Sequence, residues 1–225
     1  MKTNSQKTIR IWDLPTRLFH WLLLISVIGS FVSVNIGGNA MAWHFRFGYC
    51  ALALVLFRIV WGFAGSRYAK FSSFPPNPKA AMAYLKAKHT QSAGHNPMGA
   101  LSVYAILAVM LFQGVSGLFS NDAIMWDGPL KNLVSNDTSD LLSKLHKLNE
   151  KVIFLLVGMH LAAIIYYKRK KKESLVKPML IGNKEASAVP ANTQPAIDSV
   201  ATKTKAAIIM ATIAAFIYWL ITTFK

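Results

Sequence analysis

Five apolar stretches, each close to twenty residues long, limit what this chain can fold into. They cover about residues 18–34, 43–65, 98–119, 145–167 and 206–224. A helix needs about 20 residues to cross the hydrocarbon core of a bilayer. Inside lipid, helices are the default form for such runs because they satisfy their own backbone hydrogen bonds. The pattern therefore predicts an all-α membrane protein with five transmembrane helices.

The composition agrees with a membrane protein but leaves a large positive charge to be explained. Of the 225 residues, 53% are hydrophobic and 15% are charged, whereas soluble domains carry about 25% charged residues. The net charge of +16 would by itself suggest nucleic-acid binding. The basic residues instead cluster at the ends of the apolar stretches, as the positive-inside rule describes. We therefore expect membrane lipid around the chain and no nucleic-acid partner.

The charges of the loops predict how the helices are oriented. Three segments are strongly basic, and their residues are Lys2, Lys7, Arg10 and Arg17, then Arg67, Lys70, Lys79, Lys86 and Lys88, and finally the run 168–172. The loop after the third stretch carries four aspartates against two lysines, and the loop after the first is uncharged. These counts predict a bacterial inner-membrane protein with a cytoplasmic N-terminus and a periplasmic C-terminus. A cleavable signal peptide fits less well, because the first apolar run is long for one.

Four of the six histidines lie inside or at the ends of the apolar stretches. An ionisable residue within a membrane span is a functional candidate by default, and neutral imidazole is a common ligand of haem iron. His146 and His160 lie 14 residues apart on the fourth stretch, about 21 Å along a helix axis and on nearly the same face. With the predicted orientation, His44 shares the outer depth with His146, and His20 shares the inner depth with His160. This predicts two bis-histidine sites stacked across the membrane.

Two b-type haems would suit these sites, since the chain has no Cys-x-x-Cys-His for covalent haem attachment. Two other interpretations remain open at this point. The histidines can be unrelated residues at the membrane interfaces, or they can serve a divalent-metal transporter. Such a transporter usually carries carboxylates at the midplane, whereas the apolar stretches contain no aspartate and only Glu150, near an end.

Several motifs together resemble the prokaryotic di-haem cytochrome b family, which includes the b-type cytochrome subunits of nickel–iron hydrogenases. They are Ile11-Trp-Asp-Leu-Pro-Thr-Arg-Leu-Phe-His20-Trp, His44-Phe-Arg-Phe-Gly48, Phe57-Arg58-Ile-Val-Trp61-Gly62, Gly94-His-Asn-Pro97-Met-Gly99, and the pair His146 and His160. The resemblance covers about residues 10–168. It implies a four-helix core, electron exchange with quinone, and two haems b with His20, His44, His146 and His160 as ligands.

Four further residues are candidates for the cofactor sites. Arg58 follows His44 by 14 residues, so its guanidinium can pair with a propionate of the inner haem or snorkel towards cytoplasmic headgroups. Arg46 and Arg17 are similar candidates for the outer and inner propionates. His95 precedes the helix start predicted at Asn96-Pro97, where it can serve a quinone site or only the loop.

We expect three regions: a di-haem cytochrome b transmembrane domain over residues 1–173, a flexible linker over 174–205, and an appended transmembrane helix over 206–225. Two histidines on each iron leave no open coordination position, which suits outer-sphere electron transfer. The predicted function is an electron relay between quinone and an external c-type cytochrome or other redox protein. The resemblance also leaves open a membrane subunit of a hydrogenase-like complex or a superoxide-to-quinone oxidoreductase.

Overall fold

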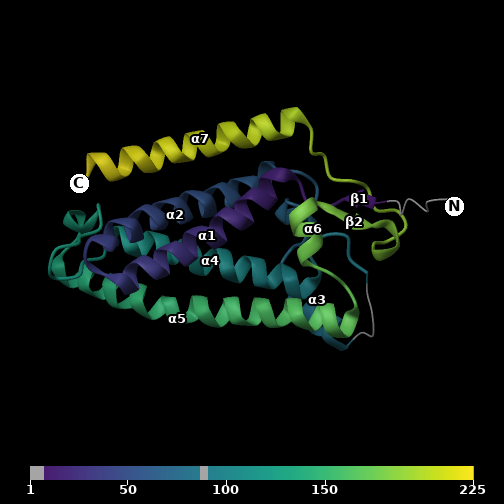
Figure 1. Cartoon of the computed structure of the whole chain (residues 1–225), viewed down its shortest axis with the longest axis horizontal. Coiled ribbons are helices and arrows are strands. Elements are labelled where there is room, and N and C mark those ends of the chain that lie inside the picture. Colours follow the sequence, from purple (N-terminus) through teal and green to yellow (C-terminus); the bar gives the residue numbers. More distant parts are fainter. Residues whose placement is uncertain (1–7, 87–90, 225) are drawn as a thin grey trace. The chain divides into compact units, whose positions relative to one another are not determined.

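The structure, a computed structural model, describes residues 8–86 and 91–224. Lys2, Lys7, Lys88 and His89 lie outside the described residues. Within the described part, five helices are long and apolar enough to cross a membrane. They are α1 (Leu14–Ile36), α2 (Met41–Ala64), α4 (Pro97–Phe119), α5 (Asn136–Tyr166) and α7 (Val200–Thr223), labelled in Figure 1. The prediction of an all-α membrane protein is confirmed.

Helix α5 begins well before the apolar stretch that predicts it. The stretch starts near residue 145, whereas α5 starts at Asn136. Ser135 explains the earlier start, because its hydroxyl accepts the backbone N–H of Thr138 at 3.2 Å and its carbonyl accepts that of Ser139 at 2.9 Å, which is the pattern of a helix N-cap. His146 therefore lies well inside a continuous helix rather than at its first turn.

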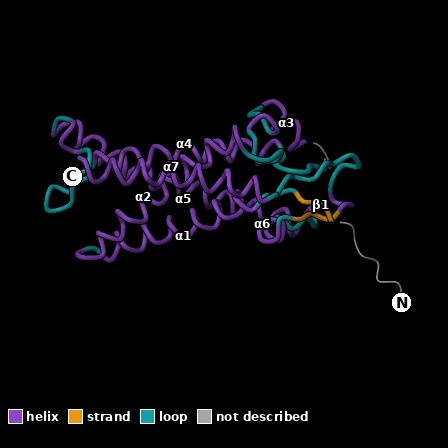
Figure 2. Tube along the Cα trace, turned by 90° about the horizontal axis from the view of Figure 1, so that it is seen from above, coloured by secondary structure: helices purple, strands orange, loops and turns teal. Residues whose placement is uncertain are grey.

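Shorter elements lie between and beside the long helices. They are α3 (Pro78–Lys86), α6 (Val176–Ile181), β1 (Thr8–Arg10) and β2 (Asn183–Glu185). The two strands, orange in Figure 2, pair antiparallel with Ile9 opposite Lys184. Residues 174–205, expected to be a flexible linker, thus contain a helix, a strand and a 3-10 turn.

The contacts divide the chain into two compact units. The first comprises residues 1–18, 60–105 and 157–206, and the second comprises residues 19–59, 106–156 and 207–225. One buried cluster of the first unit consists of Ile11, Trp12 and Val189. The carbonyl of Gly182 accepts the backbone N–H groups of both Ile11 and Trp12, at 2.8 and 3.0 Å. Residues 174–205 are therefore hydrogen-bonded to the segment that leads into α1.

The core of the second unit is built from α2, α4 and α7. Its buried side chains are Leu52, Ala53, Leu118, Leu130 and Ile217. Because Ile217 belongs to α7, the part of the fifth helix in this unit packs on the others instead of standing apart from them. The unit also holds three of the four candidate histidines, His20, His44 and His146.

Candidate functional site

His44 and His146 face one another in the second unit. Helix α2 supplies His44 and α5 supplies His146, and the centroids of the two imidazole rings are 6.3 Å apart with the ring planes at 80°. Both rings line a cavity whose walls are mostly apolar and include Gly48 and Gly117. The structure therefore brings together the two histidines that the sequence assigns to the outer depth.

A residue of α1 holds the imidazole of His44. The Nδ1 atom of His44 lies 2.9 Å from the carbonyl oxygen of Ser30 and 3.0 Å from its hydroxyl oxygen. A carbonyl only accepts hydrogen bonds, so Nδ1 carries the proton and donates. Nε2 is then the unprotonated nitrogen, whose lone pair can bind a metal ion.

Helix α4 holds the imidazole of His146 in the same way. Its Nδ1 atom lies 3.0 Å from the carbonyl oxygen of Gln113 and 3.2 Å from the hydroxyl of Ser116. The side-chain Nε2 of Gln113 lies 3.1 Å from His146 Nε2. Asn149 fixes that amide, since its Nδ2 donates to Gln113 Oε1 at 2.7 Å and to the carbonyl of Val109 at 3.1 Å.

The arrangement of these residues fits a bound haem. Two imidazoles on one metal ion, with bonds of about 2 Å, have ring centroids about 6 Å apart, close to the 6.3 Å between His44 and His146. Among the described residues, no three His, Cys, Asp or Glu side chains gather as a metal-binding group. Two facing imidazoles are nevertheless enough for haem, because the porphyrin supplies the remaining four nitrogens.

Two glycines, Gly48 and Gly117, line this cavity without a side chain. No atom lies within 4 Å of the position that a Cβ would take at Gly48. At Gly117, a Cβ would come within 2.9 Å of Cε1 of His146. A side chain at position 117 would displace the imidazole, and a large one at position 48 would enter the cavity. Gly117 therefore makes room for the imidazole of His146, and Gly48 leaves open space in which a flat ligand can approach the helix backbone.

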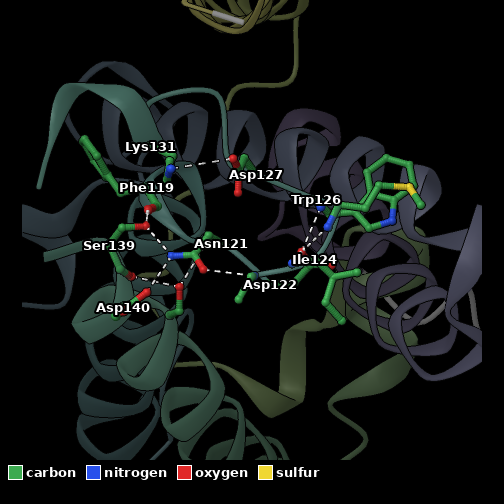
Figure 3. Close-up of polar contacts among 12 residues, drawn as sticks. Phe119, Asn121, Asp122, Ile124, Trp126, Asp127, Lys131, Ser139 and Asp140 are labelled. Carbon is green, nitrogen blue, oxygen red and sulfur yellow. Dashed lines mark hydrogen bonds and ion pairs between the residues drawn. The ribbon is translucent and has the colours of Figure 1, made fainter. Parts of the chain in front are cut away.

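The loop between α4 and α5 borders the cavity through Asn121, Asp122 and Trp126. In Figure 3 the Oδ1 atom of Asp122 accepts the backbone N–H groups of Ile124 and Trp126 at 2.9 and 2.8 Å, and it also accepts that of Met125 at 2.8 Å. Burial raises the pKa of Asp122, but backbone hydrogen bonds, these three among them, lower it by more, so the pKa lies below its ordinary value. The carboxylate thus fixes the loop.

The two candidate ligands of the inner site lie in different units. His20, on α1 in the second unit, is half-buried, and its ring meets Trp21 edge-on at a centroid distance of 5.0 Å. His160, on α5 in the first unit, is also half-buried. Their pairing stays a prediction.

The three arginines differ in their surroundings. Arg58 is buried, with 2% of its surface exposed. Arg46 is exposed, and its guanidinium carbon lies 4.6 Å from the ring centroid of Trp43, a cation–π distance. The Nη1 atom of Arg17 donates to the carbonyl of Leu180 at 2.6 Å. The proposed roles towards haem propionates stay predictions for all three.

His95 lies among aromatic residues in the first unit. Its ring centroid is 4.8 Å from that of Trp12 and 4.3 Å from that of Phe74. The adjacent Asn96 caps α4 as predicted, because its Oδ1 accepts the backbone N–H of Gly99 at 2.7 Å. His95 is thus held beside a helix start by ring contacts on two sides.

Sequence reasoning missed the part played by Asp13 in the first unit. Asp13 is 1% exposed, and its Oδ1 accepts the backbone N–H of Thr16 at 2.7 Å while its Oδ2 accepts Nε1 of Trp61 at 3.1 Å. It is therefore the N-cap of α1 and a link from α1 to α2. An aspartate followed by a proline two residues later is a recognisable helix-start signal that would have identified the cap.

The comparisons with known proteins identify the family of the chain. Residues 11–182 match the family described as prokaryotic cytochrome b561. Two relatives are named "Probable Ni/Fe-hydrogenase B-type cytochrome subunit". The one from Azotobacter vinelandii is 25% identical over 145 residues, and the one from Azotobacter chroococcum mcd 1 is 24% identical. Each match covers 52% of this chain and 60% of the relative, so the chain spans less than two thirds of their length.

No solved structure matches the chain. The family match extends from the segment before α1 through α6 and covers about three quarters of the chain. It includes all four candidate histidines and the residues that hold the His44 and His146 rings, which are Ser30, Gln113 and Ser116. The chain therefore belongs to the prokaryotic cytochrome b561 family.

Proposed function

We propose that this chain is a membrane electron-transfer cytochrome that carries two bis-histidine haems b and relays electrons between quinone and an external redox partner. The observation that carries the proposal is the facing pair His44 and His146, each with Nδ1 bonded to a main-chain carbonyl. With Nδ1 donating, Nε2 is the nitrogen of each ring that can bind iron, which is the usual arrangement of metal-binding histidines. The amide of Gln113, 3.1 Å from Nε2 of His146, would give up that contact when iron binds.

The second haem rests on the spacing within α5. His146 and His160 lie 14 residues apart on one continuous helix, which corresponds to about 21 Å along its axis. His160 and His20 are the remaining candidates for a second pair of ligands. A bound haem would supply one-electron chemistry between ferric and ferrous iron, and two histidines holding it would leave no position for a substrate. The chain then binds and orients the haems and surrounds them with apolar side chains.

The two faces of the membrane offer different chemistry. We infer that the loop with Asp122 and Asp127 lies on the periplasmic side of a bacterial inner membrane and that an external c-type cytochrome or another redox protein meets it there. Carboxylates on a docking face favour a basic partner surface. On the cytoplasmic side, His95 is a group that can exchange a proton with a quinone. The electron can travel in either direction between them.

A second candidate function is that of a membrane subunit in a hydrogenase-like complex. The names of the two Azotobacter relatives favour it. In that case the external partner would be a tightly bound enzyme rather than a diffusing carrier. Mild solubilisation separates the two, because a permanent partner copurifies with the chain and a transient one does not.

The proposed function is tested on the purified full-length chain, grown with ample haem supply. We expect two haems per chain that acidified organic solvent extracts, and reduction of both by a quinol analogue. A haem-free chain would contradict the proposal.

In the variant His95→Ala we expect unchanged haem spectra and at least about tenfold slower reduction by the quinol analogue, a typical effect of removing a proton-transfer group. Reduction of both haems by dithionite is the control, because it bypasses the quinone site. If His95→Ala reacts with quinol at the wild-type rate, quinone does not react beside His95, whereas the haem relay itself stands.

A further inference from the structure

The two facing histidines share a feature that their role as ligands does not require. Each Nδ1 atom lies within hydrogen-bond distance of a serine hydroxyl as well as a main-chain carbonyl. For His44 both acceptors belong to Ser30, at 2.9 Å for the carbonyl and 3.0 Å for the hydroxyl. For His146 the carbonyl of Gln113 lies at 3.0 Å and the hydroxyl of Ser116 at 3.2 Å.

In each case the acceptors come from a different helix than the histidine. Ser30 belongs to α1 and holds a ring carried by α2, and Ser116 belongs to α4 and holds a ring carried by α5. Ser116 is buried, with 1% of its surface exposed, so water does not compete for its hydroxyl. The rotation of each imidazole is thus fixed by the neighbouring helix.

The hydroxyl hydrogen of Ser116 has its own acceptor. Ser116 Oγ lies 3.2 Å from the carbonyl of Gln113 in a geometry that makes the hydroxyl the donor. Its lone pairs are therefore free to accept from Nδ1–H of His146. The carbonyl of Ser30, which accepts from Nδ1 of His44, also accepts the hydroxyl of Ser33 at 3.0 Å.

We propose that Ser30 and Ser116 are positioning residues that raise the basicity of His44 and His146 and thereby lower the reduction potential of the haem between them. This inference rests on the proposed function, because it takes the two histidines as ligands of one iron. A hydrogen bond donated by the far nitrogen of a ligand histidine makes the imidazole a better electron donor. A better donor stabilises the more positive, oxidised iron, so the haem becomes harder to reduce.

The variants Ser30→Ala and Ser116→Ala test the proposal on the purified haem-loaded chain. At a fixed applied potential, we expect each to increase the ratio of reduced to oxidised iron in one of the two haems by up to about tenfold. This is the lower end of the effects seen for partners of metal ligands, because each Nδ1 keeps its main-chain carbonyl acceptor. A tenfold change corresponds to an upward shift of 59 mV for a one-electron couple. The second haem should keep its potential. Redox titration of the visible spectrum measures both.

Ser26→Ala is the matched control, since Ser26 is a buried serine of α1 whose hydroxyl donates to the carbonyl of Leu22 and whose loss should change neither potential. The variants Ser30→Thr and Ser116→Thr keep the hydroxyl and should keep the wild-type potential. If an alanine variant loses one haem while its threonine variant retains both, the result also supports the proposal, because it shows that the hydroxyl is needed to position the histidine that holds this haem.

Three results would overturn the proposal. One is a pair of alanine variants that retain both haems at wild-type potentials. A second is a potential that shifts downward. A third is a threonine variant that behaves like the alanine variant, since the hydroxyl would then be irrelevant. Failure of the proposed function is recognised separately, because the wild-type chain itself would then not contain two haems.

Discussion

The variant His146→Ala is expected to reduce the haem content of the purified chain from two haems to one. The imidazole of His146 is one of two that face the same cavity, 6.3 Å from the other. A b-type haem has no covalent link to the chain, so loss of one of the two histidines that would hold it weakens its binding enough for it to be lost on purification. Haem extraction and the reduced-minus-oxidised spectrum measure the change.

A steric variant tests the same site without removing a ligand. In Gly117→Val the new Cβ would collide with the His146 ring, because the nearest ring atom lies only 2.9 Å from the Cβ position. We therefore expect the same haem to be lost. Gly158→Val is the control for the outer haem, because Gly158 does not line this cavity and no atom lies within 4 Å of its Cβ position. If both His146→Ala and Gly117→Val retained two haems, the assignment of the outer haem to His146 would be wrong.

The sequence predicted the long helices because each depends on local composition. All five apolar stretches became helices. The start of α5 was missed because a run with Asn136, Asp137 and Asp140 does not look apolar. A serine cap and helix geometry decide that boundary instead, and hydropathy does not detect either of them.

The sequence also placed His44 and His146 together, because depth along a helix can be calculated from residue number alone. It did not find Ser30, Gln113 or Asn149 as their supports. Which side chain meets a ring on another helix depends on how each helix is rotated about its axis, and the sequence does not contain that rotation in readable form. Polar residues inside apolar stretches were the available signal.

The stretch 174–205 differs most from expectation. Its content of Ala, Ser, Thr and Pro predicts a flexible linker, yet Asp198 makes a salt bridge with Arg10 at 2.9 Å and accepts the backbone N–H of Leu14 at 3.1 Å. Val189 is 3% exposed. The composition of a segment does not predict contacts between residues nearly 190 positions apart in sequence, such as Arg10 and Asp198.

The same region of the first unit gives the second large prediction, that Asp13→Ala destabilises the chain by about 2–4 kcal/mol. Loss of an N-cap side chain costs about 1 kcal/mol, and a buried donor left without an acceptor costs about 1–3 kcal/mol. Here the cap is the bond to Thr16, and the donor is Nε1 of Trp61, a side chain with no exposed surface. Thermal unfolding in detergent, followed by circular dichroism, measures the loss.

Asp13→Asn separates the two bonds, because its single amide oxygen can still cap α1 whereas its NH2 group cannot accept the N–H of Trp61. We therefore expect Asp13→Asn to restore only the cap, worth about 1 kcal/mol. Asp198 cannot replace Asp13, since its oxygens already accept from Leu14 and Arg10. Asp122→Ala removes a carboxylate from a surface loop, where water can satisfy the freed N–H groups, so we expect a smaller loss. If Asp13→Ala were no less stable than Asp122→Ala, the link from α1 to Trp61 would not stabilise the helix that carries His20.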